Sequence, residues 1–268
     1  MLTFPNAKIN IGLYITGKRA DGFHNLETIF YPIPWCDILE IVPADETIIE
    51  TSGLLIPGNS DENIVLKAYN LVKADYDIPP VKINLHKQIP MGAGLGGGSS
   101  DAVSCLLNLN KQFALAISES KLQEYALKLG SDCPFFLKNT PQFATGRGEL
   151  MQDVDINLSG KYMLVVFSGL HISTKESFQA INPKPAEFNL LHLPDFVMNK
   201  WSNSVKNDFE PYVFQKFPEL QHLKTRLMKN GAEFVAMSGS GSAVFAIFSE
   251  KPKNISLNEP IVKILIIS

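Results

Sequence analysis

One segment constrains the fold more than any other: residues 90–100 hold five glycines in eleven positions, Pro-Met-Gly-Ala-Gly-Leu-Gly-Gly-Gly-Ser-Ser. A β-prone run at residues 81–87 leads into it, and Ser99, Ser100 and Asp101 are expected to cap a helix that continues to about residue 113. A flexible turn is the alternative reading, but glycine loses much conformational entropy on folding. A glycine turn that opens a helix presents backbone amides and the helix dipole to an anion, so the segment predicts a phosphate-binding loop.

Two better-known glycine motifs fit this loop poorly. Gly92, Gly94 and Gly97 satisfy the GxGxxG spacing, but a dinucleotide fold requires an acidic residue at the end of a second strand about 20 residues later. That distance falls in the helix expected near Ser118. A Walker A loop requires lysine directly after its second glycine, where this chain has Gly98. Any lysine that binds phosphate must therefore come from another part of the chain.

The remaining pattern predicts both helices and strands, in a chain long enough for one large domain or two ordinary ones. Residues 7–15 alternate as a strand does, which places Lys8 and Asn10 on one face. Strands at residues 26–33 and within 36–51 make the opening a β meander. Helices are expected at 64–73, 118–129, 173–180 and 219–230, a short helix from Asp132 and Pro134, a strand at 162–167, and a hairpin of 234–237 with 243–248. A polar, glycine-containing stretch predicts domains at residues 1–158 and 159–268.

Composition excludes several classes of function. The formal net charge of −3 over 268 residues provides no basic field for nucleic acid or an anionic membrane. No apolar run reaches the ~20 residues of a spanning helix, and residues 1–8 lack the basic head and apolar core expected of a signal sequence. Three widely spaced cysteines favour a reducing cytoplasm, and five histidines without close spacing predict no zinc site.

Several residues have both a structural and a chemical interpretation. Lys8, on the inward face of a strand, either pairs with a carboxylate or reaches solvent from an edge strand. Asp132, before Cys133 and Pro134, suits a helix cap or a catalytic base. Phe23 and His24 suit a plain turn or a nucleobase pocket, in which one ring stacks and the imidazole reads the base edge.

Taken together, these motifs resemble the GHMP kinase superfamily. The resemblance covers most of the chain and is carried by residues 7–10, 17–24, 90–100, 129–134, 146–149, 207–208 and 238–242. It implies a two-domain α+β fold, with an N-terminal domain similar to the second domain of ribosomal protein S5 and a ferredoxin-like C-terminal domain. Two features are unusual beside the family pattern: Phe23 stands where tyrosine is frequent, and Cys133 follows the aspartate.

The resemblance also implies an activity and a set of site residues. ATP with Mg²⁺ would phosphorylate the 2-hydroxyl of 4-(cytidine 5'-diphospho)-2-C-methyl-D-erythritol, a step toward isopentenyl diphosphate in the non-mevalonate pathway. Asp132 would take the hydroxyl proton, and Lys8 would stabilise the developing charge. The nucleotide would contact Asn63, Pro90, Met91, Gly92, Ala93, Gly94, Leu95, Gly96, Gly97, Gly98, Ser99 and Ser100, the last two also being candidates for Mg²⁺. The substrate would contact Asn10, Phe23, His24, Thr174 and Phe178.

Other functions remain open at this point. The same fold could phosphorylate another small alcohol such as mevalonate or homoserine, against which the Phe23-His24 pair argues. A nicotinamide-binding oxidoreductase and an RNA-binding module are alternatives from other classes, disfavoured by the missing strand-end acid and by the acidic charge balance. The sequence leaves open whether the chain is a monomer or a homodimer.

Overall fold

The computed structural model describes residues 1–253, 255, 257 and 259–267. Its contacts divide the chain into two compact units, and both are discontinuous in sequence. The first unit comprises Met1–Ala7, Trp35–Met91 and Gly96–Thr140, and the second comprises Lys8–Pro34, Gly92–Leu95 and Pro141–Ser268. Each unit holds one of the two tryptophans, Trp35 and Trp201, both almost fully buried.

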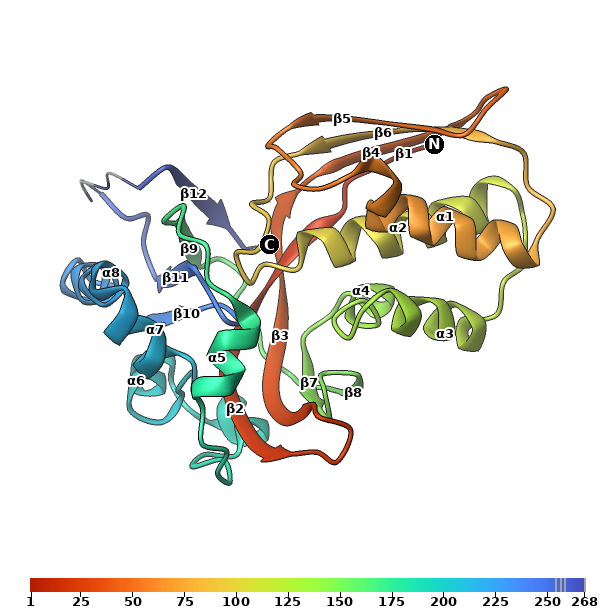
Figure 1. Ribbon diagram of the computed structural model, residues 1–268. Coiled ribbons are helices and arrows are strands. Elements are labelled where there is room, and N and C mark those ends of the chain that lie inside the picture. Colours follow the sequence, from red (N-terminus) through yellow and green to blue (C-terminus); the bar gives the residue numbers. More distant parts are fainter. Residues whose placement is uncertain (254, 256, 258, 268) are drawn as a thin grey trace. The chain divides into compact units, whose positions relative to one another are not determined.

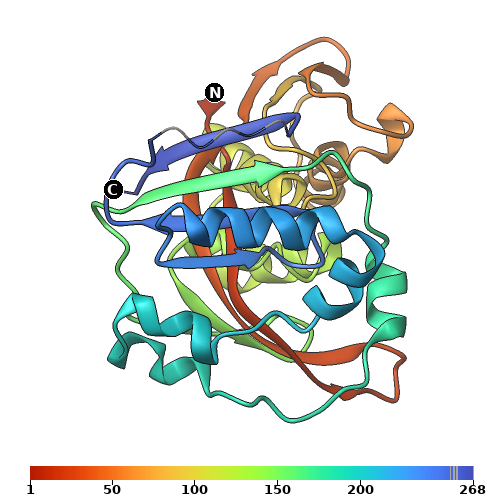
Figure 2. The same cartoon turned by 90° about the vertical axis from the view of Figure 1, so that its left-hand side faces the viewer.

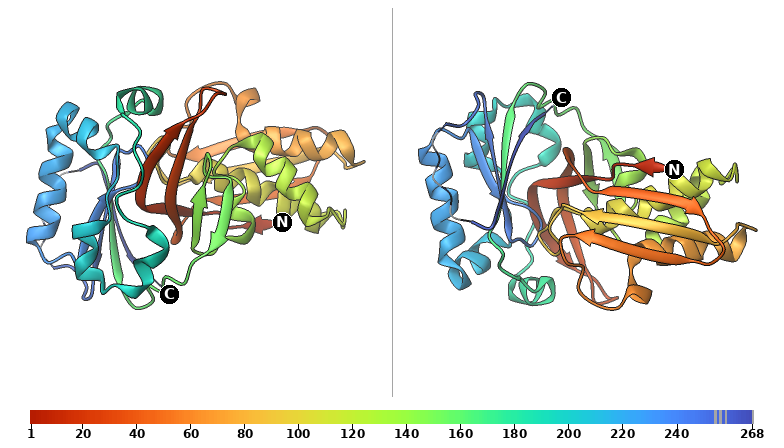
Figure 3. Two further views of the ribbon diagram at one scale, coloured as in Figure 1. Left: turned by 90° about the horizontal axis from the view of Figure 1, so that it is seen from below. Right: turned by 90° about the horizontal axis from the view of Figure 1, so that it is seen from above.

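A four-stranded sheet forms one layer of the first unit. Its strand order is β1 (Leu2–Thr3), β4 (Ile38–Pro43), β6 (Val81–Lys87) and β5 (Ile48–Gly53). β4 is antiparallel to β1 and β6, whereas β5 runs parallel to β6. Figure 3 shows the orange and yellow strands of this sheet side by side. Side chains alternate along β6, so that Val81, Ile83 and Leu85 enter the core.

Helices cover one face of this sheet (Figure 1). They are α1 (Ile64–Asp75), α2 (Gly97–Gln112), α3 (Glu119–Leu129) and the short α4 (Phe135–Lys138), with a 3₁₀ turn at Ser60–Glu62 before α1. The apolar stripe of α2, which includes Ala102, Cys105 and Leu109, packs with side chains of α1 and α3 over the sheet in one hydrophobic cluster. The side chains of Asn63 and Ser118 cap α1 and α3, and Gly130 ends α3 as expected.

A second four-stranded sheet has the order β2 (Asn6–Lys18), β3 (His24–Cys36), β7 (Gln142–Thr145) and β8 (Leu150–Asp153). The left view of Figure 3 shows the long red strands β2 and β3 beside the green β7 and β8. The expected β meander is wrong beyond this point, because β4 leaves the sheet of β3 and pairs with β1 and β6. Local alternation identified the strands, but their partners are set by segments far away in the sequence.

The third sheet is entirely antiparallel and lies in the second unit. Its order is β10 (Phe234–Met237), β11 (Ala243–Phe248), β9 (Tyr162–Phe167) and β12 (Ile261–Ile266). The helix α8 (Pro218–Lys229) lies across one face, as Figure 2 shows, and packs with α7 (Glu210–Lys216) into a core that also takes Leu13 and Ile15 from β2. The connecting elements are α5 (Thr174–Ala180), α6 (Trp201–Ser204) and 3₁₀ turns at Leu190–Asp195 and Met198–Lys200.

The predicted strand at residues 162–167, the helices near 173–180 and 219–230, and the hairpin around residues 238–242 are all confirmed. Of the residues that the structure describes, none belongs to a helix long and apolar enough to cross a membrane.

Candidate active site

The glycine loop joins the end of β6 to the start of α2. Gly96 occupies the N-cap position with φ of +70°, and α2 begins at Gly97. A Cβ on Gly97 would lie 2.9 Å from Cγ2 of Ile89, so the first helical residue has room only for hydrogen. The expectation that Ser99, Ser100 and Asp101 cap this helix is wrong, because all three lie inside it.

The N-cap residue of α2 is Gly96, which has no side chain with which to hydrogen-bond the first turn of the helix. The backbone N–H of Ser100 bonds to the carbonyl of Gly96, which is the beginning of the helical ladder. The amides before Ser100 and the positive end of the helix dipole are the groups that bind phosphate at other helix N-termini.

The middle of the loop, residues 92–95, belongs to the second unit. The carbonyl oxygen of Gly94 accepts hydrogen bonds from Oγ of Ser238 at 2.8 Å and from Nζ of Lys8 at 3.2 Å. A Cβ on Gly94 would lie 2.0 Å from the carbonyl oxygen of Ser238, and φ of Gly94 is +78°. Glycine is thus required here by both backbone conformation and close approach.

Lys8 and Asn10 point toward one another, as the strand alternation predicted. Nζ of Lys8 donates to Oδ1 of Asn10 at 2.6 Å and lies 4.9 Å from the centroid of the Phe30 ring. Nδ2 of Asn10 donates to Oγ1 of Thr28 at 3.0 Å. Both residues are 3% exposed, which excludes the reading of Lys8 as a solvent-reaching edge residue.

Asp132 lies in the first unit, in a turn that precedes α4. Pro134 occupies the N-cap position of α4, so Asp132 is not the cap of that helix. The half-exposed Asp132 neighbours Cys133, whose thiol hydrogen-bonds Ser99 of α2. Burial raises the pKa of Cys133 to about 11, so the thiol is neutral at ordinary pH. The turn of Asp132 is thereby attached to the N-terminal part of α2.

Asn63 is buried at the start of α1. Its Oδ1 accepts a hydrogen bond from the backbone N–H of Val65 at 2.9 Å, which is the geometry of a helix cap. The capping role is thus filled, and its amide Nδ2 remains the group with which it could contact a nucleoside.

Two of the predicted base-pocket residues stack on one another in the second unit. The rings of His24 and Phe178 lie 5.1 Å apart at an interplanar angle of 20°, and Phe178 makes an edge contact with Phe209 at 4.9 Å. Phe23 is 53% exposed and lies under the guanidinium of Arg147, 4.2 Å from the ring centroid. Oγ1 of Thr174, at the start of α5, lies 2.9 Å from Oγ of Ser240.

Sequence reasoning missed a buried charged cluster beside the loop. Nζ of Lys87 donates to Oδ2 of Asp101 at 2.7 Å and to Oδ2 of Asp37, and all three residues are at most 1% exposed. The signal was present, because Lys87 continues the buried face of Val81, Ile83 and Leu85 on β6. A lysine in that register requires an acidic partner.

Asn207 and Asp208 were singled out as a motif, but no role was assigned to them. Nδ2 of Asn207 donates to the carbonyl oxygens of Met237 and Gly239, each at 2.8 Å, and so fixes the turn at residues 238–242. Oδ2 of Asp208 accepts from the backbone N–H of Ile15 at 2.8 Å, while burial raises its pKa. Asn207 thus supports the turn whose Ser238 contacts Gly94, and Asp208 supports β2 at Ile15.

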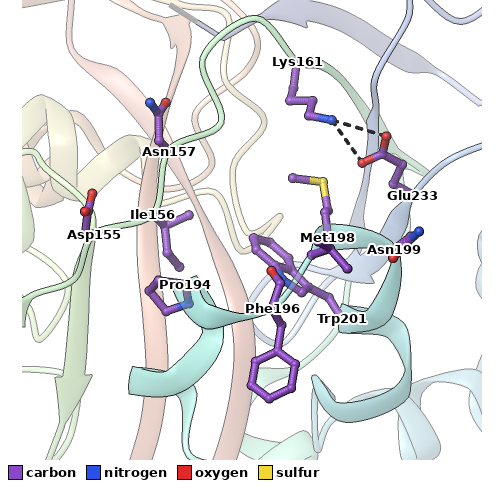
Figure 4. Close-up of a pocket in the computed structure, with 11 residues that line it drawn as sticks. Asp155, Ile156, Asn157, Lys161, Pro194, Phe196, Met198, Asn199, Trp201 and Glu233 are labelled. Carbon is purple, nitrogen blue, oxygen red and sulfur yellow. Dashed lines mark hydrogen bonds and ion pairs between the residues drawn. The ribbon is translucent and has the colours of Figure 1, made fainter.

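A separate cavity of about 640 Å³ lies in the second unit, away from the predicted site residues (Figure 4). Figure 4 shows Lys161 and Glu233 pointing toward one another at its edge, and their ion pair measures 3.1 Å. Nε1 of Trp201, at its floor, donates to the carbonyl oxygen of Phe196 at 3.1 Å. The lining residues are Asp155, Ile156, Asn157, Lys161, Pro194, Phe196, Val197, Met198, Asn199, Trp201 and Glu233.

Comparison with known families places this fold and loop in one class of enzymes. The family described as GHMP kinases N terminal domain matches residues 63–139, and the family described as GHMP kinases C terminal matches residues 195–257. A solved mevalonate kinase of Methanococcus jannaschii covers 99% of the chain and 96% of its own with a TM-score of 0.71. At 14% identity this structure shows the fold alone.

Relatives of higher identity narrow the class. A 4-diphosphocytidyl-2-C-methyl-D-erythritol kinase of Cytophaga hutchinsonii is 46% identical over 259 residues, 96% of each chain. One of Bacteroides fragilis is also 46% identical, over 94% of each chain. The crystal structure of a 4-(cytidine 5'-diphospho)-2C-methyl-D-erythritol kinase has 32% identity and a TM-score of 0.76, covering 92% of this chain and 90% of its own. The chain belongs to the 4-diphosphocytidyl-2-C-methyl-D-erythritol kinase family of GHMP kinases.

Proposed function

We propose that this protein transfers the γ-phosphoryl group of ATP to the 2-hydroxyl of 4-(cytidine 5'-diphospho)-2-C-methyl-D-erythritol, in the non-mevalonate route to isopentenyl diphosphate. Phosphoryl transfer is inferred from the glycine loop, which ends in the N-terminus of α2 with Gly96 as its N-cap residue, an arrangement that presents backbone amides to a phosphate. The acceptor is inferred from the curated relatives, which are named as kinases of this compound over nearly the whole chain. We also propose that the functional domains divide near residue 158.

The loop would hold the triphosphate through backbone amides near the start of α2. The hydroxyls of Ser99 and Ser100 are oxygen donors of the kind that suit Mg²⁺, although Ser100 is buried and Ser99 is half-exposed. Mg²⁺ would neutralise charge on the transferring phosphoryl group. In this proposal the remaining loop residues, from Pro90 to Gly98, shape the backbone around the phosphates.

Asp132 and Lys8 are proposed as the catalytic pair. The carboxylate of Asp132 would accept the proton of the 2-hydroxyl, which makes that oxygen a better nucleophile. The ammonium of Lys8 would stabilise negative charge on the ionised hydroxyl and on the transferring group. Asn10 supports the lysine, because its Oδ1 accepts the 2.6 Å hydrogen bond that orients Nζ.

The cytidine end of the substrate is assigned to the aromatic residues of the second unit. His24 is proposed to read the edge of cytosine by hydrogen bonding, while Phe178 and Phe23 supply aromatic faces. His24 covers one face of Phe178 in the present arrangement, so a base that stacks on that face would displace the imidazole. Thr174 would add a hydroxyl at the start of α5.

The direct test is ADP release with ATP and Mg²⁺, compared among the cytidyl compound, methylerythritol phosphate, mevalonate and homoserine. We expect turnover with the cytidyl compound and none above background with the others. Asp132→Asn, which preserves side-chain shape, is the control for contaminating kinases. Turnover with mevalonate or homoserine alone would retain the kinase class and reject the acceptor, and absence of turnover with all four would reject the proposal.

A further inference from the structure

The cluster of Lys87, Asp37 and Asp101 connects three separate segments of the first unit. Lys87 is the last residue of β6, Asp37 lies between β3 and β4, and Asp101 lies in the second turn of α2. The ammonium of Lys87 binds one oxygen of each carboxylate, and the side chains of Lys87 and Asp37 are 0% exposed. A lysine and two acidic side chains are costly to bury, so packing alone does not account for them.

The cluster holds the glycine loop at its first end. Oδ1 of Asp37 accepts hydrogen bonds from the backbone N–H of Gln88 at 2.5 Å and of Ile89 at 2.8 Å. These are the residues that lead from β6 into the loop. The position of Asp37 is itself fixed, because its backbone N–H donates to the carbonyl of Pro5 at 2.9 Å.

The same cluster holds the second end of the loop. A Cβ on Gly97 would lie 3.3 Å from Nζ of Lys87, so the first residue of α2 lies beside the ammonium group with little space between them. One turn later, Oδ2 of Asp101 accepts from that ammonium at 2.7 Å. Lys87 therefore joins the strand before the loop to the helix after it, through atoms that a phosphate ligand would not touch.

We propose that Lys87, Asp37 and Asp101 form an internal clamp that fixes both ends of the glycine loop in the conformation that binds the phosphates of the nucleotide. The inference rests on the proposed function, because it assigns the loop to ATP. The three are positioning residues, since they act through the backbone of Ile89 and Gly97. An ordered loop loses less entropy when it binds, so the clamp strengthens nucleotide binding without a direct contact.

The test compares Lys87→Met, which keeps length but removes charge, with the neutral variant Lys87→Met/Asp37→Asn/Asp101→Asn. Lys87→Met leaves the buried acidic side chains of Asp37 and Asp101 without their cationic partner and is expected to lower stability, whereas the variant in which all three side chains are neutral recovers most of it. Both variants are expected to bind ADP and a non-hydrolysable ATP analogue at least tenfold more weakly. The loss of affinity for AMP should be smaller than that for ADP, because AMP has only one phosphate for the loop to contact.

Leu109→Ala is the matched control, since Leu109 is a buried residue of the same helix about two turns beyond Asp101. It destabilises the same unit without touching the clamp and should leave the ratio of ADP to AMP affinity unchanged. Hydrogen exchange of peptides covering residues 88–101 gives a readout independent of nucleotide. Exchange there should rise in both clamp variants and remain at the wild-type rate in Leu109→Ala.

The clamp would be refuted if the folded neutral variant bound ADP with wild-type affinity. It would also be refuted if Leu109→Ala changed the ratio of ADP to AMP affinity and the local exchange as much as the clamp variants do. Failure of the proposed function gives a different pattern. In that case the wild-type protein would not bind ADP or the ATP analogue, while local exchange would still report whether the clamp orders the loop.

Discussion

Nζ of Lys8 and Oδ1 of Asn10, two positions apart on β2, are joined by a 2.6 Å hydrogen bond inside a buried part of the second unit. Asn10 uses its other end on Thr28, so the amide is held in one orientation and in turn fixes the lysine. Under the proposal that Lys8 acts in catalysis, this support is useful because a lysine has four rotatable bonds and loses less side-chain entropy in the reaction when it is already held.

Replacing Lys8 and Asn10 should therefore affect turnover in a graded way. Lys8→Met is expected to lower kcat at least 100-fold, about 2.7 kcal/mol of lost transition-state stabilisation. Asn10→Ala should lower kcat by about tenfold, because Lys8 remains but loses its anchor. Steady-state ADP release measures both. Full turnover in Lys8→Met would remove the residue from the mechanism, and equal losses in the two variants would contradict a supporting role for Asn10.

His24→Ala should impair recognition of the cytidyl substrate. The KM for that substrate is expected to rise at least tenfold, while the KM for ATP stays within about twofold, since the loss of a buried hydrogen bond costs about 1–3 kcal/mol. His222→Ala, on the exposed face of α8, is the control for a histidine of the same unit. An unchanged KM for the cytidyl substrate in His24→Ala would refute the base-reading role.

Gly94→Ala should destabilise the protein, because the added methyl would meet the carbonyl of Ser238 at 2.0 Å and the backbone has φ of +78°. Overpacking and left-handed strain together predict a loss of about 3 kcal/mol in the free energy of unfolding. Gly98→Ala is the comparison: it is helical, with Cγ2 of Ile64 at 3.9 Å, and should gain about 0.5–1 kcal/mol. Denaturant unfolding distinguishes them, and equal stability of the two variants would argue against the close approach.

Asp101 should make stability depend on pH. Desolvation raises its pKa to about 8, and its Oδ1 has no hydrogen-bond partner among the described residues. The folded state thus holds the proton more tightly than the unfolded state, whose pKa is near 3.9. The stabilisation that this proton gives the folded state is fully present below about pH 4 and is lost as the pH rises to the folded pKa of Asp101. Above that pKa, Asp101 no longer makes the stability depend on pH.

The variant Asp101→Asn lacks this titration, with Lys87 and Asp37 as the charged groups that still face position 101. The free energy of unfolding of Asp101→Asn, relative to that of the wild type, should increase as the pH rises from 5 to 8. Urea unfolding across this range measures the difference. Parallel curves for the two proteins would show that Asp101 does not titrate there.

Asn63 can be tested for its two roles separately. Asn63→Ala should cost about 1 kcal/mol of stability through the lost cap, whereas Asn63→Asp retains a capping oxygen. The aspartate removes the amide donor, so a nucleoside contact predicts a severalfold rise in the KM for ATP at unchanged stability. If Asn63→Asp keeps the wild-type KM, the residue is a cap and nothing more.

Much of the local structure could be predicted from the sequence, because it depends on neighbouring residues. The alternation along residues 7–15 placed Lys8 beside Asn10, and the caps Asn63 and Ser118 and the stop Gly130 were recognisable from residue type. The glycine loop was found because its composition is costly without a ligand.

The predictions that were wrong concern features that depend on contacts between residues far apart in the sequence. Ser99 and Ser100 are good capping residues, but α2 starts earlier because Gly97 fits the space beside Ile89 and Lys87. Pairing of β4 with β1 and β6 is non-local, so the meander could not be rejected from alternation alone. The acidic partners of Lys87 lie 50 and 14 positions away, and only the folded chain brings them together.

Because Trp35 and Trp201 lie in different units, tryptophan fluorescence can follow the unfolding of each unit. Trp35→Phe and Trp201→Phe each leave a single buried indole, whose emission shifts when water reaches it. The two variants would therefore record separately how each half of this interleaved chain loses structure in denaturant. Coincident transitions would mean that the two units unfold cooperatively, because the chain passes between them several times. Separate transitions would mean that one unit stays folded at denaturant concentrations that unfold the other.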